Sequence, residues 1–428
     1  MRIAIFHLGF FYSGGGEKLV LEEMRGLRNL GHHVTSFAPY VDREGCYPGV
    51  SEMAEIRPLL PPPPRWLPMK DPLWVALSCL LIPFMAWRFR SFDVFFGANQ
   101  PGPWFACVLS KLLRKPYVIY LAQPLRLLHP RQVDLENGIR IREGDHRFLM
   151  AIKKMAGWLI NLADRWSVTN AHTVLTNGDH VSRWIREVYG IENQVCAAGC
   201  HPVPQEDLDY ASRWQGVLEV NGHKVHKPYV LLTNRHSPMK RFEYAIEAHK
   251  AARRTGCAVS LVITGQETEY TNQLRAMVDQ HGLNGTVHFV GLVPERELGQ
   301  LYAGAVLYVY PSPEEDFGMG IVEAMAAGTP VVAWNSGGPT GIVDDRITGF
   351  LVKPEDVPAF CECVRRLSID PSLAERLGRA GHARAQDRFC YERHNRMVEE
   401  TLAGALEGLA LVKAGEGTQV PSPKWVER

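Results

Sequence analysis

The feature that most constrains the fold of this chain is a pattern of short apolar strand, loop and amphipathic helix that occurs twice. The first copy opens with RIAIF (2–6), continues through three glycines at 14–16 and reaches the helical segment EKLVLEEMRGLRNLG. The second copy opens with YVLLTN (229–234), which precedes the helical segment RFEYAIEAHKAARR. Strands that alternate with helices predict parallel sheets covered on both faces. We therefore predict an α/β protein with two doubly wound domains that face one another across a cleft.

The same pattern continues along both halves and sets the expected domain boundaries. We predict an N-terminal domain over residues 1–200 and a C-terminal domain over 201–395. Residues 199–228 contain no clear core segment and are predicted to form the passage between the domains. A helix over 396–413 is expected to pack back toward the N-terminal domain, and residues 414–428 are expected to be a disordered tail. The other predicted strands are 34–39, 92–98, 116–122 and 172–177, then 260–265, 287–291, 305–311, 329–334 and 349–352.

Length and composition are those of a globular protein with more than one core. The chain has 428 residues, of which 46% are hydrophobic, and this exceeds what one ordinary core organises. The formal net charge of +1 gives no reason to expect nucleic acid as a partner. Nine cysteines at scattered spacings do not form a disulfide framework, so a reducing, cytoplasmic location is expected.

One apolar run bears on membrane contact. The run from Leu73 to Trp87 is about five residues short of a typical span of ~20 and contains Pro83. We predict a buried or interfacial helix there and not a membrane span. The start of the chain has a basic residue and an apolar run without a small-residue cleavage site, and it is predicted to be a buried strand.

Two glutamates flank a glycine pair in PSPEEDFGMGIVEAMAAGTP (311–330), which follows a predicted strand. Gly318 and Gly320 allow backbone N–H groups to approach an anion closely at the start of a helix. A carboxylate cannot bind phosphate, but it accepts two hydrogen bonds from vicinal hydroxyls. Glu323, about one turn into the helix, suits a ribose diol, and Glu315, in the loop, suits a sugar ring. The pattern indicates a ligand with an anionic part and a hydroxylic part.

A second loop supplies positive charge. The stretch NRHSPMKR (234–241) follows the first strand of the second half and brings Arg235 and Lys240 to the carboxyl end of the predicted sheet. These cations would neutralise a diphosphate. Together with the two glutamates they describe a site for a nucleotide diphosphate sugar. The glycines at 14–16 would let the first domain close over the diphosphate or receive the acceptor.

These segments resemble the signatures of retaining glycosyltransferase family 4, whose members have the GT-B fold of two facing Rossmann-like domains. Residues 311–332 are similar to the family's Glu-x7-Glu motif, and NRHSPMKR is similar to its Arg-x4-Lys donor clamp. The stretches VHFVGLVPERELGQLYAGA, WNSGGPTGIV and GGGEKLV fall in the family's order, so the resemblance spans nearly the whole chain. GGGEKLV and YLAQPLR most resemble mannosyltransferases that act on lipid-linked or polysaccharide acceptors.

The resemblance implies transfer of a hexose, with retention, from a nucleotide diphosphate sugar to a saccharide or lipid-linked acceptor, with no cofactor and no metal. The likeness to mannosyltransferases favours GDP-mannose as donor. Arg235 and Lys240 would stabilise the departing nucleoside diphosphate, and Glu315, the third catalytic residue, would contact the transferred sugar. Glu323 would contact the ribose. The implied donor site comprises Gly15, Gly16, Arg235, Lys240, Gly265, Glu315, Phe317, Gly318, Met319, Gly320, Ile321, Val322 and Glu323.

Two positions depart from the family's pattern. YLAQPLR has Ala122 where relatives often carry a histidine, and an alignment shifted by one residue would put Gln123 in its place. No side-chain base can then be named, and the leaving-group phosphate would accept the proton. GGPTGIV has Gly341 where relatives often carry glutamate. On the acceptor side we expect Gln123 and Arg126.

Residues 126–160 interleave cations with the apolar stretches FLMAI and GWLI. This pattern fits a membrane-facing surface that receives a lipid-linked acceptor, which would place the protein peripherally on the cytoplasmic face of a membrane. It fits equally an amphipathic helix packed on the first domain with a solvated rim. The cations are Arg126, Arg131, Arg140, Arg142, Arg147, Lys153 and Lys154.

The motif residues are also compatible with roles outside glycosyl transfer. Taken singly, Glu315 is a solvated loop charge, Glu323 a charge at a helix start, and Arg235 with Lys240 a surface pair. A non-catalytic relative that binds nucleotide sugars would fit Ala122. An NAD(P)-dependent oxidoreductase would fit the first strand–glycine–helix unit, although GGGEKL lacks the G-x-G-x-x-G spacing.

Metal binding and histidine catalysis are weaker interpretations. Cys196, Cys200 and His201 lack a fourth ligand at familiar zinc spacing, and the DLD at 207–209 lies in the predicted passage between domains. His7, His172 and His236 lie near strand ends. For each of these three a local hydrogen bond is a better interpretation than catalysis.

Overall fold

The computed structural model describes residues 1–10, 14–42, 46, 50, 53, 55–64, 66–67, 70–136 and 147–414, with the backbone alone at 147–156 and 411–414. The predicted tail beyond Ala414 lies outside the described residues. So do Arg140 and Arg142 of the basic segment, together with the side chains of Arg147, Lys153 and Lys154.

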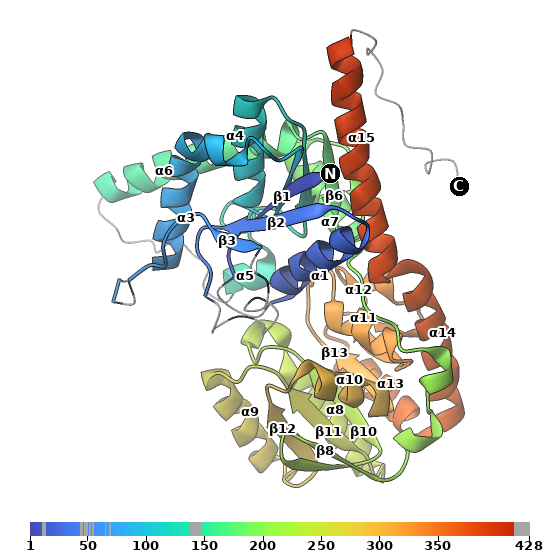
Figure 1. Ribbon diagram of the computed structural model, residues 1–428. Helices are drawn as coiled ribbons and strands as arrows, with labels where there is room; N and C mark the ends of the chain where they lie inside the picture. The colour runs from blue at the N-terminus through green and yellow to red at the C-terminus, as the bar shows by residue number, and fades with distance from the viewer. Residues whose placement is uncertain are drawn as a thin grey trace.

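The N-terminal domain is built on a parallel seven-stranded sheet (Figure 1). Its order is β3-β2-β1-β4-β5-β6-β7, so the chain winds outward from β1 in both directions. The central strands β1, β4 and β5 are almost wholly buried, as their continuous apolar runs predict. The elements are β1 Arg2–His7, α1 Gly15–Asn29, β2 His33–Ala38, β3 Ile56–Pro58, α3 Lys70–Leu81, the 3-10 helix η1 Ile82–Phe89, β4 Val94–Ala98, α4 Gly102–Leu113, β5 Tyr117–Leu121, α5 Gln132–Glu136, α6 Arg147–Thr169, β6 Thr173–Thr176, α7 Asp179–Tyr189 and β7 Gln194–Val195.

The C-terminal domain repeats this design on a parallel six-stranded sheet of order β12-β11-β10-β13-β14-β15. The order again reverses beside its first long strand, β10. The prediction of an α/β protein with two doubly wound domains is confirmed. The elements are η2 Gln205–Asp207, η3 Ala211–Arg213, β8 Val217–Val220, β9 His223–His226, β10 Tyr229–Thr233, η4 Pro238–Lys240, α8 Phe242–Arg254, β11 Ser260–Thr264, α9 Glu269–Gln280, β12 Val287–Gly291, α10 Glu295–Gly304, β13 Leu307–Tyr310, α11 Met319–Ala326, β14 Val331–Trp334, α12 Pro339–Ile342, β15 Gly349–Val352, α13 Val357–Ile369, α14 Pro371–Arg388 and α15 Tyr391–Ala414.

Part of the predicted passage at 199–228 is folded, which corrects the expectation that it has no core segment. Strands β8 and β9 form an antiparallel hairpin, and Val220 and Val225 are buried. Asn221 and Gly222 at its turn both have positive φ, the conformation that an Asn-Gly pair adopts in a tight hairpin. The sequence signal was therefore present, but the strands are short and mostly polar.

The chain crosses between the domains twice, and the two crossings lie side by side. The backbone N–H of Cys200 donates to Phe389 O at 2.6 Å, and that of Tyr391 donates to Cys200 O at 3.1 Å. A Cβ at Gly199 would lie 2.6 Å from the Tyr391 backbone, so only glycine permits this approach. The paired crossings join the domains on the side where α15 returns.

Helix α15 begins at Tyr391, before the predicted start at 396, and lies against α1 of the N-terminal domain (Figure 1). A Cβ at Gly26 of α1 would fall 1.9 Å from Asn395 Nδ2, so the glycine allows the two helices to approach closely. His394 Nε2 lies 3.1 Å from Glu23 Oε1, and both side chains are fully buried. A buried ion pair thus fixes the returning helix to α1.

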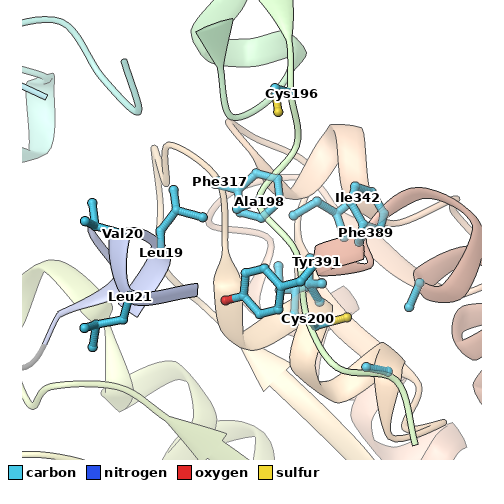
Figure 2. Close-up of a cluster of buried hydrophobic side chains, with 14 of the residues drawn as sticks. Leu19, Val20, Leu21, Cys196, Ala198, Cys200, Phe317, Ile342, Phe389 and Tyr391 are labelled. Carbon is cyan, nitrogen blue, oxygen red and sulfur yellow. The ribbon is translucent and has the colours of Figure 1, made fainter. Parts of the chain in front are cut away.

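Apolar side chains also join the two domains. Figure 2 shows Leu19 of α1 near Phe317, Ile342, Phe389 and Tyr391 of the C-terminal half, all in one buried cluster. The Phe317 and Phe389 rings lie 6.2 Å apart between centroids. The interface between the domains is therefore in part a continuous hydrophobic core.

The apolar run of the first half forms a helical segment longer than the run itself. Helix α3 and η1 together cover Lys70–Phe89, which is long and apolar enough to cross a membrane by length and composition alone. Only 17% of its most apolar stretch is buried, so the expectation of a buried helix is wrong. The interfacial alternative stays a prediction.

Candidate active site

The motif loops follow the strands at which each sheet reverses its order. In the C-terminal domain, the loop at 234–241 follows β10, and the loop at 311–318 follows the adjacent strand β13. In the N-terminal domain the glycine loop follows β1. Ligands of doubly wound sheets bind at such switch points, beyond the carboxyl ends of the strands. The described glycines and both motif loops thus lie where such a ligand would bind.

Lys240 and Glu315 form the central ion pair of this edge. Lys240 Nζ lies 2.5 Å from Glu315 Oε2, and the two side chains are 23% and 16% exposed. Burial acts to raise the pKa of Glu315, but Lys240 and the Tyr310 hydroxyl hold it below its ordinary value. Glu315 is therefore an ionised, mostly buried acceptor and not a solvated loop charge.

Helix α11 begins at this edge, and glycines shape its start. Gly318 has φ +113°, which disfavours other residues. A Cβ at Gly320 would lie 2.3 Å from the Tyr308 hydroxyl. A Cβ at Gly15 would lie 3.7 Å from Met319 Cγ, so the glycine loop of the other domain lies directly against the helix start. Backbone N–H groups at such a start are suited to an anion.

Glu323 receives a cation from the opposite domain. Lys18 Nζ lies 2.8 Å from Glu323 Oε1 and 3.0 Å from Glu295. The Tyr302 hydroxyl donates to Glu323 Oε2 at 2.9 Å. Burial acts to lower the pKa of Lys18, but Glu323 raises it above its ordinary value. Glu323 is held by specific partners, which a helix-dipole role would not require.

A second ionic cluster joins the domains beside Glu315. Arg126 Nη2 pairs with Asp316, and Arg126 Nη1 lies 2.7 Å from Asp134 Oδ2. Arg131 Nη1 donates to Glu314 O at 2.7 Å. Burial raises the pKa of Asp316 to about 6 in spite of Arg126 and Arg131. Within the described residues, Arg126 Nε and Asp316 Oδ1 are buried without a hydrogen-bond partner.

The predicted donor residues differ in how far their side chains are exposed. Arg235 is exposed on the loop after β10, while Gly16 faces His7, which a Cβ there would approach to 3.5 Å. The side chains of Phe317, Ile321 and Val322 are buried, so only their backbone is available to a ligand. A ligand at this helix start would therefore contact these three residues through their backbone N–H groups.

Gly265 has a packing reason to be glycine. Its φ is +137°, and a Cβ there would lie 1.8 Å from Asn234 O. Gly265 thereby supports the loop that carries Arg235. Gln123 and Arg126 both lie after β5, and Ala122 is held through its backbone by Asn99 and Asn177.

Three participants were missed in the sequence: Lys18, Asp316 and Tyr302. Lys18 directly follows the glycine loop, so its position was a usable signal. Asp316 and Tyr302 lacked one, because each gains its partner only when segments distant in the chain meet. Arg126 and Arg131 were among the cations expected either on a membrane-facing surface or on the rim of a packed amphipathic helix. Both are mostly buried in ion pairs with Asp134 and Asp316, so neither alternative holds for these two residues.

The three histidines near strand ends each make a hydrogen bond within the protein, but only that of His7 is local in the sequence. His7 Nδ1 lies 3.0 Å from Gly9 O, His236 Nδ1 2.9 Å from Thr271 Oγ1, and His172 Nδ1 3.3 Å from Tyr117 N. Burial lowers the pKa of His7 and of His236 to about 4. Both imidazoles are therefore neutral near pH 7.

The cysteine–histidine group does not converge on one point. Cys196 Sγ lies 3.4 Å from His394 Nδ1, whereas His201 Nε2 lies 3.0 Å from Glu22. Across the part of the chain that the structure describes, no three His, Cys, Asp or Glu side chains are grouped as metal ligands. The buried cysteines act as small apolar side chains.

Two family profiles cover most of the chain. Residues 14–198 match the glycosyl transferase 4-like domain, and residues 217–384 match the glycosyl transferases group 1. The chain is 31% identical over 407 residues to the alpha-1,3/1,6-mannosyltransferase ALG2 of Homo sapiens, over 89% of this chain and 90% of that protein. It is 30% identical over 196 residues to the O-antigen chain mannosyltransferase B of Escherichia coli, over 46% and 47% of the two chains.

Solved structures share the fold. HepE of Anabaena, solved in complex with UDP and glucose, has a TM-score of 0.67 and 19% identity over 94% of this chain and 99% of its own. Sucrose-phosphate synthase of Thermosynechococcus elongatus has a TM-score of 0.69 and 19% identity over 94% and 98%. With both family profiles and the near-full-length relative, the chain belongs to the family 4 glycosyltransferases of the GT-B fold.

Proposed function

We propose that this glycosyltransferase moves mannose from GDP-mannose to a saccharide on a lipid-linked acceptor, with retention and without a metal ion. The mannosyltransferase relatives, one of them named for the O-antigen chain, support the sugar and a saccharide acceptor. The observation that carries the proposal is the Lys240–Glu315 pair, 2.5 Å apart beside the glycine-shaped start of α11. A sugar diphosphate bound at this helix start would meet a cation and a hydroxyl acceptor where the sugar joins its diphosphate.

The donor would lie with its diphosphate at the start of α11. Lys240 has three N–H donors and uses one on Glu315, so two remain for phosphate oxygens. Arg235 is exposed on the same loop and would close on the diphosphate. These fixed positive charges would stabilise the leaving group as the glycosidic bond breaks. They would fill the role that a divalent cation has in metal-dependent transferases.

Glu315 and Glu323 would hold the two hydroxylic ends of the donor. The ionised Glu315 would accept hydrogen bonds from the transferred sugar while Lys240 fixes its orientation. Glu323 would accept the ribose hydroxyls, with Lys18 and Tyr302 keeping its carboxylate in place. Lys18 adds a positive charge from the glycine-loop side, so both domains would bind one donor.

The transfer step requires no protein base. The acceptor oxygen would attack the anomeric carbon from the face that the diphosphate leaves, which retains configuration. The bond between the anomeric carbon and the phosphate oxygen breaks, and that phosphate accepts the hydroxyl proton. His7 and Ala122 agree with this route, because burial lowers the pKa of His7 to about 4 and so makes it a weak base, and the Ala122 side chain has no titratable group.

A ligand panel tests the donor. Thermal unfolding would be measured with GDP-mannose, UDP-glucose, UDP-GlcNAc and NAD(H). A ligand at about 100 times its dissociation constant stabilises by ~2.7 kcal/mol. We expect GDP-mannose to shift wild type and not Glu323→Ala. Glu295→Ala is the matched control, because Glu295 also pairs with Lys18 but is mostly exposed.

The outcomes separate the alternatives. A shift by a UDP-sugar alone would replace the mannose assignment, and a shift by NAD(H) alone would contradict a nucleotide-sugar site. If the protein binds the donor but neither transfers the sugar nor slowly hydrolyses the donor, it is a non-catalytic relative. NMR of the product's anomeric proton tests retention, and loss of activity in EDTA would contradict metal independence.

A further inference from the structure

The N-terminal domain carries a large apolar surface on segments that the donor site does not use. Trp66 is 79% exposed. Along α3 and η1, Leu80 is 70% exposed, Phe84 is 79% exposed and Trp87 is 68% exposed. Apolar surface of this size is unfavourable in water, and covering it would lower the free energy. The donor site lies on other elements and cannot cover them.

Helix α6 adds a second row to the same surface. Trp158, Leu159, Leu162 and Trp166 of α6 are exposed, although α6 lies about 80 residues further along the chain. Trp104 of α4 connects the rows: its Nε1 donates to Cys79 O of α3 at 3.2 Å, and its ring lies 5.8 Å from that of Trp166. Figure 1 shows α3, α4 and α6 together at one side of the domain. We call Trp66, Leu73, Leu80, Phe84, Trp87, Trp158, Leu159, Leu162 and Trp166 the α3–α6 face.

The segment 70–89 is held along the domain by its opposite side. Ile82 and Phe89 are fully buried, and Trp74 Nε1 donates to Pro61 O at 2.7 Å. The Tyr40 hydroxyl donates to Asp71 at 2.5 Å. A helix anchored on one side and apolar on the other lies flat at an interface, whereas a spanning helix would leave the domain.

The charges around this face are mostly positive. Segments 66–90, 102–115 and 157–170 contain seven Lys or Arg and two acidic residues, although the whole chain is nearly balanced. The two acids are Asp71 and the buried Asp164, and both accept hydrogen bonds from tyrosines. The seven cations outnumber the two acids, so these segments carry a net positive charge that attracts an anionic surface.

A cavity of about 450 Å³ opens at the end of η1, and its lining is cationic. Arg2, Arg57, Arg88 and His33 line it, and its lining includes no acidic residue. Arg88 lies in the segment that carries Phe84 and Trp87. The cavity could hold a phosphate group while the adjacent aromatic side chains enter the acyl boundary, where tryptophan is favoured.

We propose that the α3–α6 face docks on an anionic lipid bilayer, with the arginine-lined cavity taking lipid phosphate headgroups. Aromatic and aliphatic side chains with a basic rim are what such a surface binds. The docking places the protein on the membrane from which a lipid-linked acceptor would come. It does not require the proposed donor chemistry, because donor contacts and lipid contacts lie on different elements.

Vesicle co-sedimentation tests the proposal on the full chain. Wild type would be mixed with phosphatidylcholine vesicles, with and without phosphatidylglycerol. We expect binding to the anionic vesicles and a partition coefficient about ten-fold or more lower for Phe84→Glu/Trp87→Glu. Leu292→Glu is the matched control, because Leu292 is 69% exposed on the C-terminal domain. It should bind as wild type does.

A second variant tests the cavity separately. Arg57→Ala/Arg88→Ala should weaken binding to anionic vesicles and leave the residual binding to neutral vesicles unchanged. Thermal shift by the nucleotide sugar should be unaltered in both double variants, so a failed donor assignment and a failed docking surface give different results. Equal sedimentation of wild type and Phe84→Glu/Trp87→Glu would overturn the proposal.

Two other occupants predict different results. If a second copy covers the face, wild type is a dimer in ultracentrifugation and Phe84→Glu/Trp87→Glu is a monomer without any lipid. If the segment 70–89 spans the bilayer, membrane-bound protein resists alkaline carbonate. Either result would contradict docking. If the face docks on a bilayer, we expect a monomer in the absence of lipid, and we expect alkaline carbonate to release the membrane-bound protein.

Discussion

The two domains share one strand order but contribute differently to the site. The C-terminal domain brings charged side chains to the edge of its sheet, with Lys240 and Glu315 paired at 2.5 Å. The N-terminal domain brings a glycine loop, whose Gly15 faces Met319, and a single lysine that reaches Glu323. One half thus carries the groups suited to the donor, and the other supplies close backbone approach.

The ion pairs between the two domains differ in how deeply they are buried. Near the crossings, Glu23 and His394 pair in complete burial beside an apolar cluster. At the opposite edge, Arg241 and Glu136 meet across the domains at 3.3 Å while staying partly exposed. Two domains with the same strand order can therefore have different roles, because the loops after the strands and the burial of their side chains decide what each domain can bind. The following predictions test it.

The largest effect is expected where the returning helix is fixed. Glu23→Ala leaves a buried imidazole without its carboxylate and should lower the free energy of unfolding by about 3–5 kcal/mol. Denaturant unfolding followed by fluorescence measures it. Glu247→Ala is the control, since Glu247 pairs with His281 at 2.8 Å with both side chains partly exposed. It should cost less than about 1 kcal/mol. Equal losses would show that burial does not separate the two pairs.

The next effect concerns catalysis in the C-terminal half. Arg235→Ala removes an exposed cation that we propose contacts the leaving group, and kcat/KM should then fall by about 10²–10³ with Tm unchanged. Arg254→Ala, an exposed arginine at the end of α8, should leave kcat/KM unchanged. A loss smaller than two-fold for Arg235→Ala would remove it from the donor clamp.

Acid should weaken both halves through buried histidines. Burial lowers the pKa of His7, His236 and His249 to about 4. The unfolded chain therefore binds more protons between pH 6.5 and 4, and stability falls as the pH falls through that window. Each histidine contributes roughly 3 kcal/mol to the fall.

Replacing one histidine checks this assignment. His249→Gln should flatten the pH dependence of the unfolding free energy between pH 6.5 and 4, whereas His223→Gln, at an exposed position on β9, should not. Asp316 acts in the opposite sense, because its pKa of about 6 lies above the unfolded value and its ionisation costs stability as pH rises from about 4 to 6. An unchanged slope in His249→Gln would contradict the neutral, buried state of that ring.

The smallest effect is expected at the exposed contact between domains. Arg241→Ala breaks the pair with Glu136 and should lower the unfolding free energy by less than about 1 kcal/mol, because water screens both charges. Donor affinity by calorimetry should stay within two-fold, roughly 0.4 kcal/mol. A larger loss would mean that this contact, like that of Glu23, helps to hold the domains together.

Periodicity and motif order determined much of the fold and part of the site. Strands such as β1 and β10 are buried on both faces, so their apolar runs identified them without neighbours. Strands β3 and β7 were missed, because three and two residues at a sheet edge carry little pattern. Lys240 and the glycines around α11 were found because local turn chemistry and spacing encode them.

Tertiary structure alone decided the partners. Lys18 and Glu323 are 305 residues apart, and no local pattern shows that folding brings them to 2.8 Å. Arg126 and Arg131 belong to a basic stretch in the sequence, yet the domain contact buries them against Asp316. The exposed face of 70–89 was likewise undecided, since an apolar helix looks the same in sequence whether a core covers it or not. Sequence determines which segments form elements, whereas pairing and burial depend on contacts between distant segments.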